Sequence, residues 1–192
     1  RNRRLICHTF TFAPFVMEIK RVALWFQQKA RSMQIRAVTQ RDHNVLWDML
    51  KPVFRSGETY AIDPNISQQN ALGYWIGADA GCFVIEENGT LLGTYYLKTN
   101  APGGGAHVCN CGFITAPIAA GKGVARAMLT DALTRAKEAG YAAMQFNFVL
   151  ANNTRAIDIW HRSGFDTVGR LPNAFNHPKD GLIDALVMFK TL

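Results

Sequence analysis

A short glycine-rich loop joins a strand-like run to a long amphipathic segment, and this junction constrains the fold more than any other feature. The run spans 108–115, and the loop reads Ala120-Gly121-Lys122-Gly123-Val124-Ala125. Glycines allow a tight turn and leave no Cβ between the backbone and a ligand. The unpaired N–H groups and the positive dipole end of the next helix would face this loop. Strand, loop and helix in this order predict a site for a phosphate-bearing ligand, and a helix start without a ligand is the alternative.

The spacing of the loop excludes two other phosphate-binding motifs. No Gly-Lys-Ser or Gly-Lys-Thr follows with the Walker spacing, which argues against a nucleoside triphosphatase. The dinucleotide fingerprint requires a third glycine and an acidic residue after the next strand. Arg126 or Ala127 stands at the third position, and the next strand ends in Asn152-Asn153. A Rossmann-type site is therefore excluded.

The segment after the loop has a regular order of elements. Apolar residues recur at helical spacing over 122–139, and Gly140 is a natural helix stop. A strand is expected over 142–150, and Asn153 is placed to cap a helix over 154–162. The other elements are expected as strands at 35–38, 82–86, 90–98, 108–115, 165–168 and 182–190, and as helices at 42–54 and 66–77.

Two ordered motifs resemble those of the GNAT superfamily of acetyl-CoA-dependent N-acyltransferases. They are Gly121–Ala125 and the later run Asn153–Phe165, and the resemblance covers about Ile35 to Leu192. It implies an α+β fold of GNAT type, with a mixed, largely antiparallel central sheet whose strands four and five are splayed and flanked by helices. It also implies acetyl-CoA as co-substrate. The cofactor-binding residues carried over are Phe113, Ile114, Thr115, Ala120, Gly121, Lys122, Gly123, Val124, Ala125, Asn153 and Trp160.

Three asparagines resemble those of a fungal branch that acetylates toxic proline analogues such as azetidine-2-carboxylate. They are Asn110, Asn147 and Asn153, and the resemblance implies that they are the catalytic residues. Trp160 replaces the tyrosine common elsewhere in the superfamily, and tryptophan is normal in this branch. The implied reaction is direct transfer of an acetyl group to the amine of a small molecule, an amino acid or proline analogue. An aromatic region supplies the substrate-binding residues Tyr60, Tyr74 and Tyr95.

The chemistry of acyl transfer agrees with asparagines in the site. An amide offers two donors and one acceptor, so it can polarise a carbonyl group or hold an amine. A buried Asn110 that bridges two splayed strands is the structural alternative. The strand 142–150 carries no Asp or Glu, so we expect the proton of the amine to pass through a water molecule or directly to bulk solvent.

Two rival functions remain open at this point. A sensor that binds an acyl-CoA without transfer would keep the glycine loop and lose the asparagines, and all three are present. A protein or peptide N-acetyltransferase often keeps a carboxylate on strand five, where this chain has Phe146-Asn147-Phe148. Neither the acceptor nor the oligomeric state follows from the sequence, and a homodimer is compatible with it.

The net charge of +7 comes almost entirely from one end of the chain. Residues 1–32 hold seven basic residues and one acid, leaving 14 basic against 13 acidic residues in 33–192. The charge therefore gives no reason to expect nucleic-acid binding by the domain. The apolar run 10–17 is too short to span a membrane. We expect 1–32 to be an N-terminal extension or misassigned start, with a targeting segment as the alternative, and 33–192 to be the N-acetyltransferase domain.

The pattern His107-x-Cys109-x-Cys111 offers three metal-ligand side chains on one strand face. Successive residues of that face lie ~7 Å apart, too far for all three to meet one ion. No C-x-x-C pair is present either, so no metal is expected. Four cysteines without paired spacing indicate a reducing, cytoplasmic location.

Overall fold

The described residues form one sheet with helices on both faces. The computed structural model describes residues 33–77 and 81–192, so the prediction for 1–32 lies outside it. The strand order is β1-β2-β3-β4-β5-β7-β6, and only the β4–β5 pair is parallel. The strands are β1 (Met33–Ala37), β2 (Gly81–Glu87), β3 (Thr90–Thr99), β4 (Val108–Thr115), β5 (Ala143–Leu150), β6 (Asp166–His177) and β7 (Gly181–Thr191).

Glycines and a capping side chain set the ends of the helices that border the site. α4 starts after Gly123, whose φ is 78°, and it is followed by Gly140 with φ 83°. The side chain of Asn153 caps α5 by accepting a hydrogen bond from Ala156 N, as predicted. No helix among the described residues is long and apolar enough to span a bilayer. The helices are α2 (His43–Ser56), α3 (Gln68–Ile76), α4 (Val124–Glu138) and α5 (Thr154–Arg162), with short 3-10 turns at Gln40–Asp42, Gly103–Gly105 and Pro117–Ala119.

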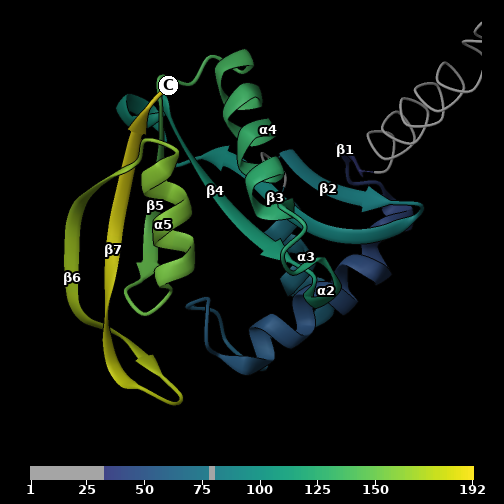
Figure 1. Cartoon of the computed structure of the whole chain (residues 1–192), viewed down its shortest axis with the longest axis horizontal. Coiled ribbons are helices and arrows are strands. Elements are labelled where there is room, and N and C mark those ends of the chain that lie inside the picture. The colour runs from purple at the N-terminus through teal and green to yellow at the C-terminus, as the bar shows by residue number, and fades with distance from the viewer. Residues whose placement is uncertain (1–32, 78–80) are drawn as a thin grey trace, which may run out of the picture.

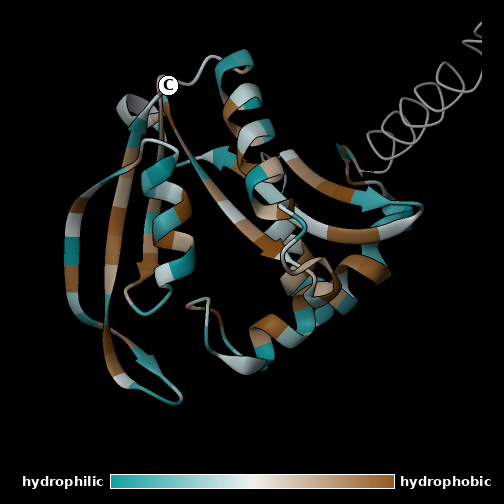
Figure 2. Cartoon of the chain, in the orientation of Figure 1, coloured by the Kyte–Doolittle hydropathy of each residue, from teal (hydrophilic) through white to brown (hydrophobic). Residues whose placement is uncertain are grey.

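Two hydrophobic clusters lie on opposite faces of the sheet. One joins α4 and α5 to the strands through residues such as Met128 and Trp160, and the other joins α2 and α3 through Leu50 and Trp75. Figure 2 shows β7 as mostly hydrophobic, whereas hydrophobic and hydrophilic residues alternate along β6 at the sheet edge. The fold is therefore the mixed, largely antiparallel α+β sheet expected from the sequence.

The parallel pair β4–β5 is the weak point of this sheet. Its pairing covers only Val108–Asn110 against Ala143–Gln145. Beyond these residues the strands separate, and in Figure 1 they lie close near the C-terminus and spread toward their carboxyl ends. The expected splay of strands four and five is confirmed, and it opens a gap in the middle of the sheet.

The strand expected at 165–168 is far longer in the structure. β6 continues to His177 and pairs with β7, so the segment 171–180 is mostly strand and turn. Pro172 and Asn173 look like loop residues in the sequence. A pairing irregularity between Leu171 and Phe175 accommodates them, and Asn173 takes a positive φ of 51° there. The lysine after the strand, Lys179, reaches Glu58 with Nζ–Oε1 at 2.6 Å.

The buried carboxylate of Asp42 holds the 3-10 turn before α2, and acid should release it. Asp42 accepts two hydrogen bonds from Arg36, at 2.7 and 2.8 Å, and one from Thr39 N at 2.7 Å. The Arg36 guanidinium holds the pKa of Asp42 well below its ordinary range. Because the folded pKa is depressed, this stabilisation is present above the unfolded pKa of about 3.9 and is lost as the pH falls through the folded pKa.

We therefore expect Asp42→Asn to lower the free energy of unfolding by about 2 kcal/mol at neutral pH and by progressively less below pH ~4. Urea unfolding at several pH values measures this difference. Asp48→Asn, which removes an exposed carboxylate from the same helix, is the control. An undiminished effect of Asp42→Asn at pH 3 would contradict the ion-pair explanation.

Candidate active site

The open edge of β4 presents to the gap backbone groups that are not paired with another strand. The carbonyl of Val108 accepts a hydrogen bond from Asn100 N at 2.9 Å, so the backbone of Val108 faces β3. Alternate residues of a strand face the same neighbour, so Cys111 and Phe113 turn their N–H and C=O groups the other way. The Tyr60 hydroxyl donates to the carbonyl of Phe113 at 2.8 Å, in agreement with this direction. The N–H groups of Cys111 and Phe113 therefore point into the gap between β4 and β5.

Asn110 lies where the two strands part, and both ends of its amide are used. Its Nδ2 donates to the carbonyl of Gln145 on β5 at 2.9 Å, and its Oδ1 accepts from the Tyr96 hydroxyl on β3 at 3.1 Å. The side chain is only 6% exposed. This is the bridging arrangement that the sequence left open as an alternative. Asn110 fixes the point at which the gap begins.

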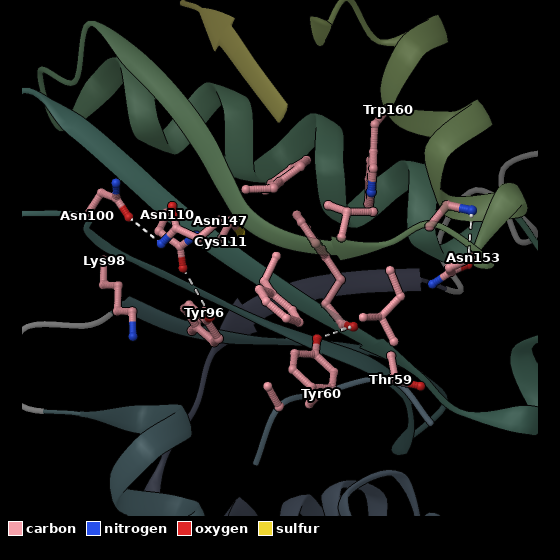
Figure 3. Close-up of a pocket in the computed structure, with 18 of the residues that line it drawn as sticks. Thr59, Tyr60, Tyr96, Lys98, Asn100, Asn110, Cys111, Asn147, Asn153 and Trp160 are labelled. Carbon is pink, nitrogen blue, oxygen red and sulfur yellow. Dashed lines mark hydrogen bonds between the residues drawn. The ribbon is translucent and has the colours of Figure 1, made fainter. Parts of the chain in front are cut away.

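A cavity of about 340 Å³, called here the polar cavity, occupies the gap (Figure 3). It is bounded by the loop after α2, by α3, by β3 to β5 and by the start of α5. All three predicted asparagines line it, as do Tyr60 and Tyr74. The lining residues that carry polar side chains are Thr59, Tyr60, Tyr74, Tyr96, Lys98, Asn100, Asn110, Cys111, Asn147, Asn153 and Trp160.

Asn147 belongs to an amide network at the wall of this cavity. Its Oδ1 accepts from Gln145 Nε2 at 2.8 Å, and its Nδ2 donates to Asn100 Oδ1 at 2.7 Å. Asn147 and Phe148 have no register partner on β7, because the pairing of β5 with β7 is irregular between Phe146 and Val149. Through its bond to Asn100, Asn147 joins β5 to the residue that follows β3.

A second cavity of about 690 Å³, the loop cavity, lies against the glycine loop and the start of α4. A Cβ added to Gly121 or Gly123 would meet no atom within 4 Å, and both glycines have φ values near 78° (77° and 78°). Within the described part of the chain, no side chain caps the N-terminus of α4. Its N–H groups are therefore free to bind an anionic group.

Three arginines on this cavity were missed by the sequence analysis. Arg126 is in the first turn of α4, whereas Arg155 and Arg162 lie on α5, and all three line the loop cavity. Arg162 Nη2 lies 3.4 Å from Asp158 Oδ2, and Asp158 lines the loop cavity as well. Arg126 is the third residue after Gly123, so the sequence alone could have placed it in the first turn of the helix that follows the loop. The two arginines of α5 line the same cavity because β4 and β5 separate, which leaves α5 on the far side of the cavity from the start of α4.

Three of the predicted site residues lie elsewhere. Tyr95 is fully buried on the α4 face, where its hydroxyl donates to Asp131, and its neighbour Tyr96 lines the polar cavity instead. The side chain of Ile114 is buried in the cluster with α2 and α3, so it faces neither cavity. Lys122 points to Glu87, with Nζ–Oε2 at 3.4 Å, and lines neither cavity. The side chains of Tyr95 and Ile114 lie away from the cavities because successive strand residues face opposite sides of a sheet.

The two cavities adjoin at a shared wall. Four residues line both of them: Phe113, Asn153, Ala156 and Trp160. The Trp160 ring is 8% exposed and packs 5.2 Å from Phe113 and 4.9 Å from Phe146 between ring centroids. Trp160 is thus both a packed aromatic residue and part of the wall between the cavities.

The polar cavity offers hydrogen bonds but no ionisable carboxylate or imidazole. Among the described residues that line it there is no Asp, Glu or His. Burial raises the pKa of the Tyr60 and Tyr96 hydroxyls and of the Cys111 thiol, so these groups stay protonated. Such a site can orient a ligand and donate hydrogen bonds to it.

Comparison with known proteins assigns this geometry to a family. Residues 43–165 match the acetyltransferase (GNAT) family. The chain belongs to the GNAT family. A GCN5-related N-acetyltransferase from Kribbella flavida is 34% identical, with a TM-score of 0.81 over 85% of this chain and 99% of that chain. N-acetyltransferase aca1 from Schizosaccharomyces pombe is 28% identical over 148 residues, 68% of this chain and 71% of the relative.

A further solved structure shares the GNAT fold at lower identity. The structure of yncA from Salmonella typhimurium, which contains acetyl-CoA, is 21% identical, with a TM-score of 0.74 over 84% of this chain and 95% of that chain. The present GNAT protein is an N-acyltransferase that uses acetyl-CoA as co-substrate. The loop cavity fits such a ligand: its glycines leave room for phosphates, and its arginines and helix N-terminus supply positive charge.

The metal pattern noted in the sequence has another explanation in the structure. Cys109 Sγ donates to the carbonyl of Ala143 at 3.3 Å, which links β4 to β5. Among the described residues, no three His, Cys, Asp or Glu side chains are grouped to hold an ion. The buried cysteines on β4 therefore act as core residues of the sheet.

Proposed function

We propose that this GNAT protein transfers the acetyl group of acetyl-CoA directly to the amine of a small molecule, an amino acid or proline analogue. The observation that carries the proposal is the shared wall at Phe113, Asn153, Ala156 and Trp160. A thioester reaching the wall from the loop cavity would meet an amine held in the polar cavity. A cavity of about 340 Å³ suits a small acceptor.

The reaction needs a neutral amine and donors for the developing oxyanion. The acceptor nitrogen attacks the thioester carbonyl carbon, the C–S bond breaks, the thiolate leaves, and the proton of the nitrogen passes to water. The N–H groups of Cys111 and Phe113, which face the gap, are placed to polarise the carbonyl. Water is the proton acceptor, since the described lining of the polar cavity holds no carboxylate or imidazole.

The cavity residues have different roles in this proposal. Asn147 and Asn153 position the reacting groups, and Asn110 acts through the strands by holding the gap open. The indole N–H of Trp160 can donate a hydrogen bond to the departing thiolate but cannot protonate it. The thiol of Cys111 stays neutral because burial raises its pKa, which supports direct transfer rather than an acyl-cysteine intermediate.

The choice of acceptor rests on the resemblance to the proline-analogue branch. All three asparagines of that resemblance line one cavity, and the relative from Schizosaccharomyces pombe is itself a fungal N-acetyltransferase.

Cys82, Cys109 and Cys111 are free thiols. This supports the further proposal that the protein works in a reducing compartment such as the cytoplasm.

A pair of variants at Asn153 tests this arrangement. Asn153 Oδ1 caps α5, so its Nδ2 is the end of the amide that remains for a ligand. Asn153→Ala removes both and should lower the free energy of unfolding by about 1 kcal/mol. Asn153→Asp keeps the capping oxygen but is acceptor-only when ionised. We expect both variants to lose at least about tenfold in turnover, which corresponds to 1.4 kcal/mol.

Thiol release from acetyl-CoA with azetidine-2-carboxylate as acceptor measures turnover, and urea unfolding measures stability. Asn153→Asp keeps the oxygen that caps α5 and removes the Nδ2 donor, so it separates the two roles of Asn153. Normal turnover by Asn153→Asp would show that Asn153 serves α5 alone, and would remove it from the proposed site.

A further inference from the structure

One side chain of the polar cavity carries a formal charge. Among the described residues that line the cavity, Lys98 is the only Lys, Arg, Asp or Glu. It lies on β3 directly opposite Asn110 in the register with β4, and two residues after Tyr96 on the same face of the strand. The polar cavity is therefore positively charged at this position.

Two tyrosine rings hold the ammonium group at the cavity. Lys98 Nζ lies 4.9 Å from the ring centroid of Tyr96 and 5.1 Å from that of Tyr74. The two rings meet edge to face at 6.2 Å, and the Tyr96 hydroxyl is bonded to Asn110. A cation placed over aromatic faces is attracted to them by the quadrupoles of the rings.

The ammonium group of Lys98 has no carboxylate partner within residues 33–77 and 81–192. Two other lysines of this protein do have one, since Lys122 pairs with Glu87 and Lys179 pairs with Glu58. A half-buried lysine held over two rings at a ligand-sized cavity, with its N–H donors available, is suited to bind an anion.

Figure 3 places Lys98 and Asn100 at one end of the cavity and Trp160 and Asn153 at the other. Asn110, Cys111 and Asn147 lie beside Asn100, on its side toward Trp160, where β4 and β5 part. An acceptor whose amine lies at the open edge of β4 would direct its remaining polar group toward Lys98. A carboxylate is the group that a lysine and a neighbouring amide would bind together.

We infer that Lys98 binds the carboxylate of the acceptor, so that the protein selects amino or imino acids over neutral amines. This inference rests on the proposed function. Lys98 is then a specificity residue, and it does not take part in the proton transfer. Asn100 assists it from the same end of the cavity, and the bond between Asn100 and Asn147 ties the carboxylate site to the strand that borders the reacting groups.

The test compares an acid with its methyl ester in two proteins. The acceptors are azetidine-2-carboxylate and L-proline, each with its methyl ester, and the variant is Lys98→Met, which keeps an apolar stem over the rings. Loss of a charged hydrogen bond should lower kcat/KM for the acids by about 10- to 100-fold, mainly through KM. The esters should change by less than about threefold. For each acceptor, kcat/KM of Lys98→Met is divided by kcat/KM of the unmodified protein, so the intrinsic reactivity of the amine cancels.

Lys51→Met, which removes an exposed charge from α2, is the matched control and should leave both acceptors unchanged. Equal losses for acid and ester in Lys98→Met, or no loss, would overturn the role of Lys98 while leaving the proposed function intact. An unmodified protein that acetylates neither acids nor esters would instead refute the proposed function.

Binding of the products gives a readout that needs no variant. By calorimetry the unmodified protein should bind N-acetyl-L-proline at least about tenfold more tightly than its methyl ester. Equal affinities would overturn the inference even if Lys98→Met does not fold.

Discussion

Replacing Asn110 by alanine is expected to lower the free energy of unfolding by about 3 kcal/mol, whereas the same change at Asn147 should cost less than about 1 kcal/mol. The two side chains make similar bonds, two each through both ends of the amide. They differ in burial, since Asn110 is 6% exposed and Asn147 is exposed to solvent.

The difference follows from what each substitution leaves behind. Asn110→Ala leaves the Tyr96 hydroxyl and the Gln145 carbonyl without their partner at a buried position, and each such group costs about 1–3 kcal/mol. At Asn147 water replaces the lost bonds. We nevertheless expect Asn147→Ala to lower kcat/KM by at least about tenfold, a loss of 1.4 kcal/mol in transition-state stabilisation.

Urea unfolding and thiol-release rates on the same preparations decide this comparison. If the two variants had the same free energy of unfolding, the bridging role of Asn110 would be contradicted. Normal acetylation by a well-folded Asn147→Ala protein would contradict the positioning role of Asn147.

Gly123→Ala is expected to raise KM for acetyl-CoA at least about tenfold, whereas Gly140→Ala should change it less than twofold. The two glycines form a matched pair at opposite ends of α4. Their φ values are 78° and 83°, and a Cβ at either position would meet no atom within 4 Å. Each alanine should therefore cost a similar 1–2 kcal/mol or so of backbone strain.

Only the change at Gly123 puts a methyl group beside the loop cavity, where we place the phosphates of acetyl-CoA. Steady-state KM and calorimetric binding of acetyl-CoA measure the effect, and unfolding by urea confirms that both variants lose equal stability. Equal KM values in the two variants would show that the glycine loop is needed for the turn alone.

The sequence was sufficient where a local signal fixes an element. The strand 108–115 and the helix 154–162 have their predicted bounds, because a glycine loop ends the first region and Asn153 caps the second. β6 was predicted too short, since Pro172 and Asn173 read as loop residues. Only pairing with β7 holds that segment extended, and such pairing is a long-range contact that the local pattern does not contain.

Side-chain direction was the other limit. Tyr95 and Tyr96 are equivalent in the sequence, and their faces are decided by the register that sets Tyr96 opposite Gly112. A Cβ on Gly112 would lie 2.5 Å from the Tyr96 ring, so this glycine lets the ring lie against β4. Once Tyr96 is known to face the cavity, alternation also predicts Lys98 and Asn100. Neither Lys98 nor Asn100 was among the residues predicted for the site.

The most direct test of the account is acetylation of a panel of acceptors by the unmodified protein. Thiol release from acetyl-CoA is measured with azetidine-2-carboxylate, L-proline, other amino acids, polyamines and short peptides, and each product is identified by mass spectrometry. We expect the highest kcat/KM for a small amino or imino acid, with one acetyl group on its nitrogen. Acetylation of peptides alone, or tight binding of acetyl-CoA without turnover of any acceptor, would contradict it.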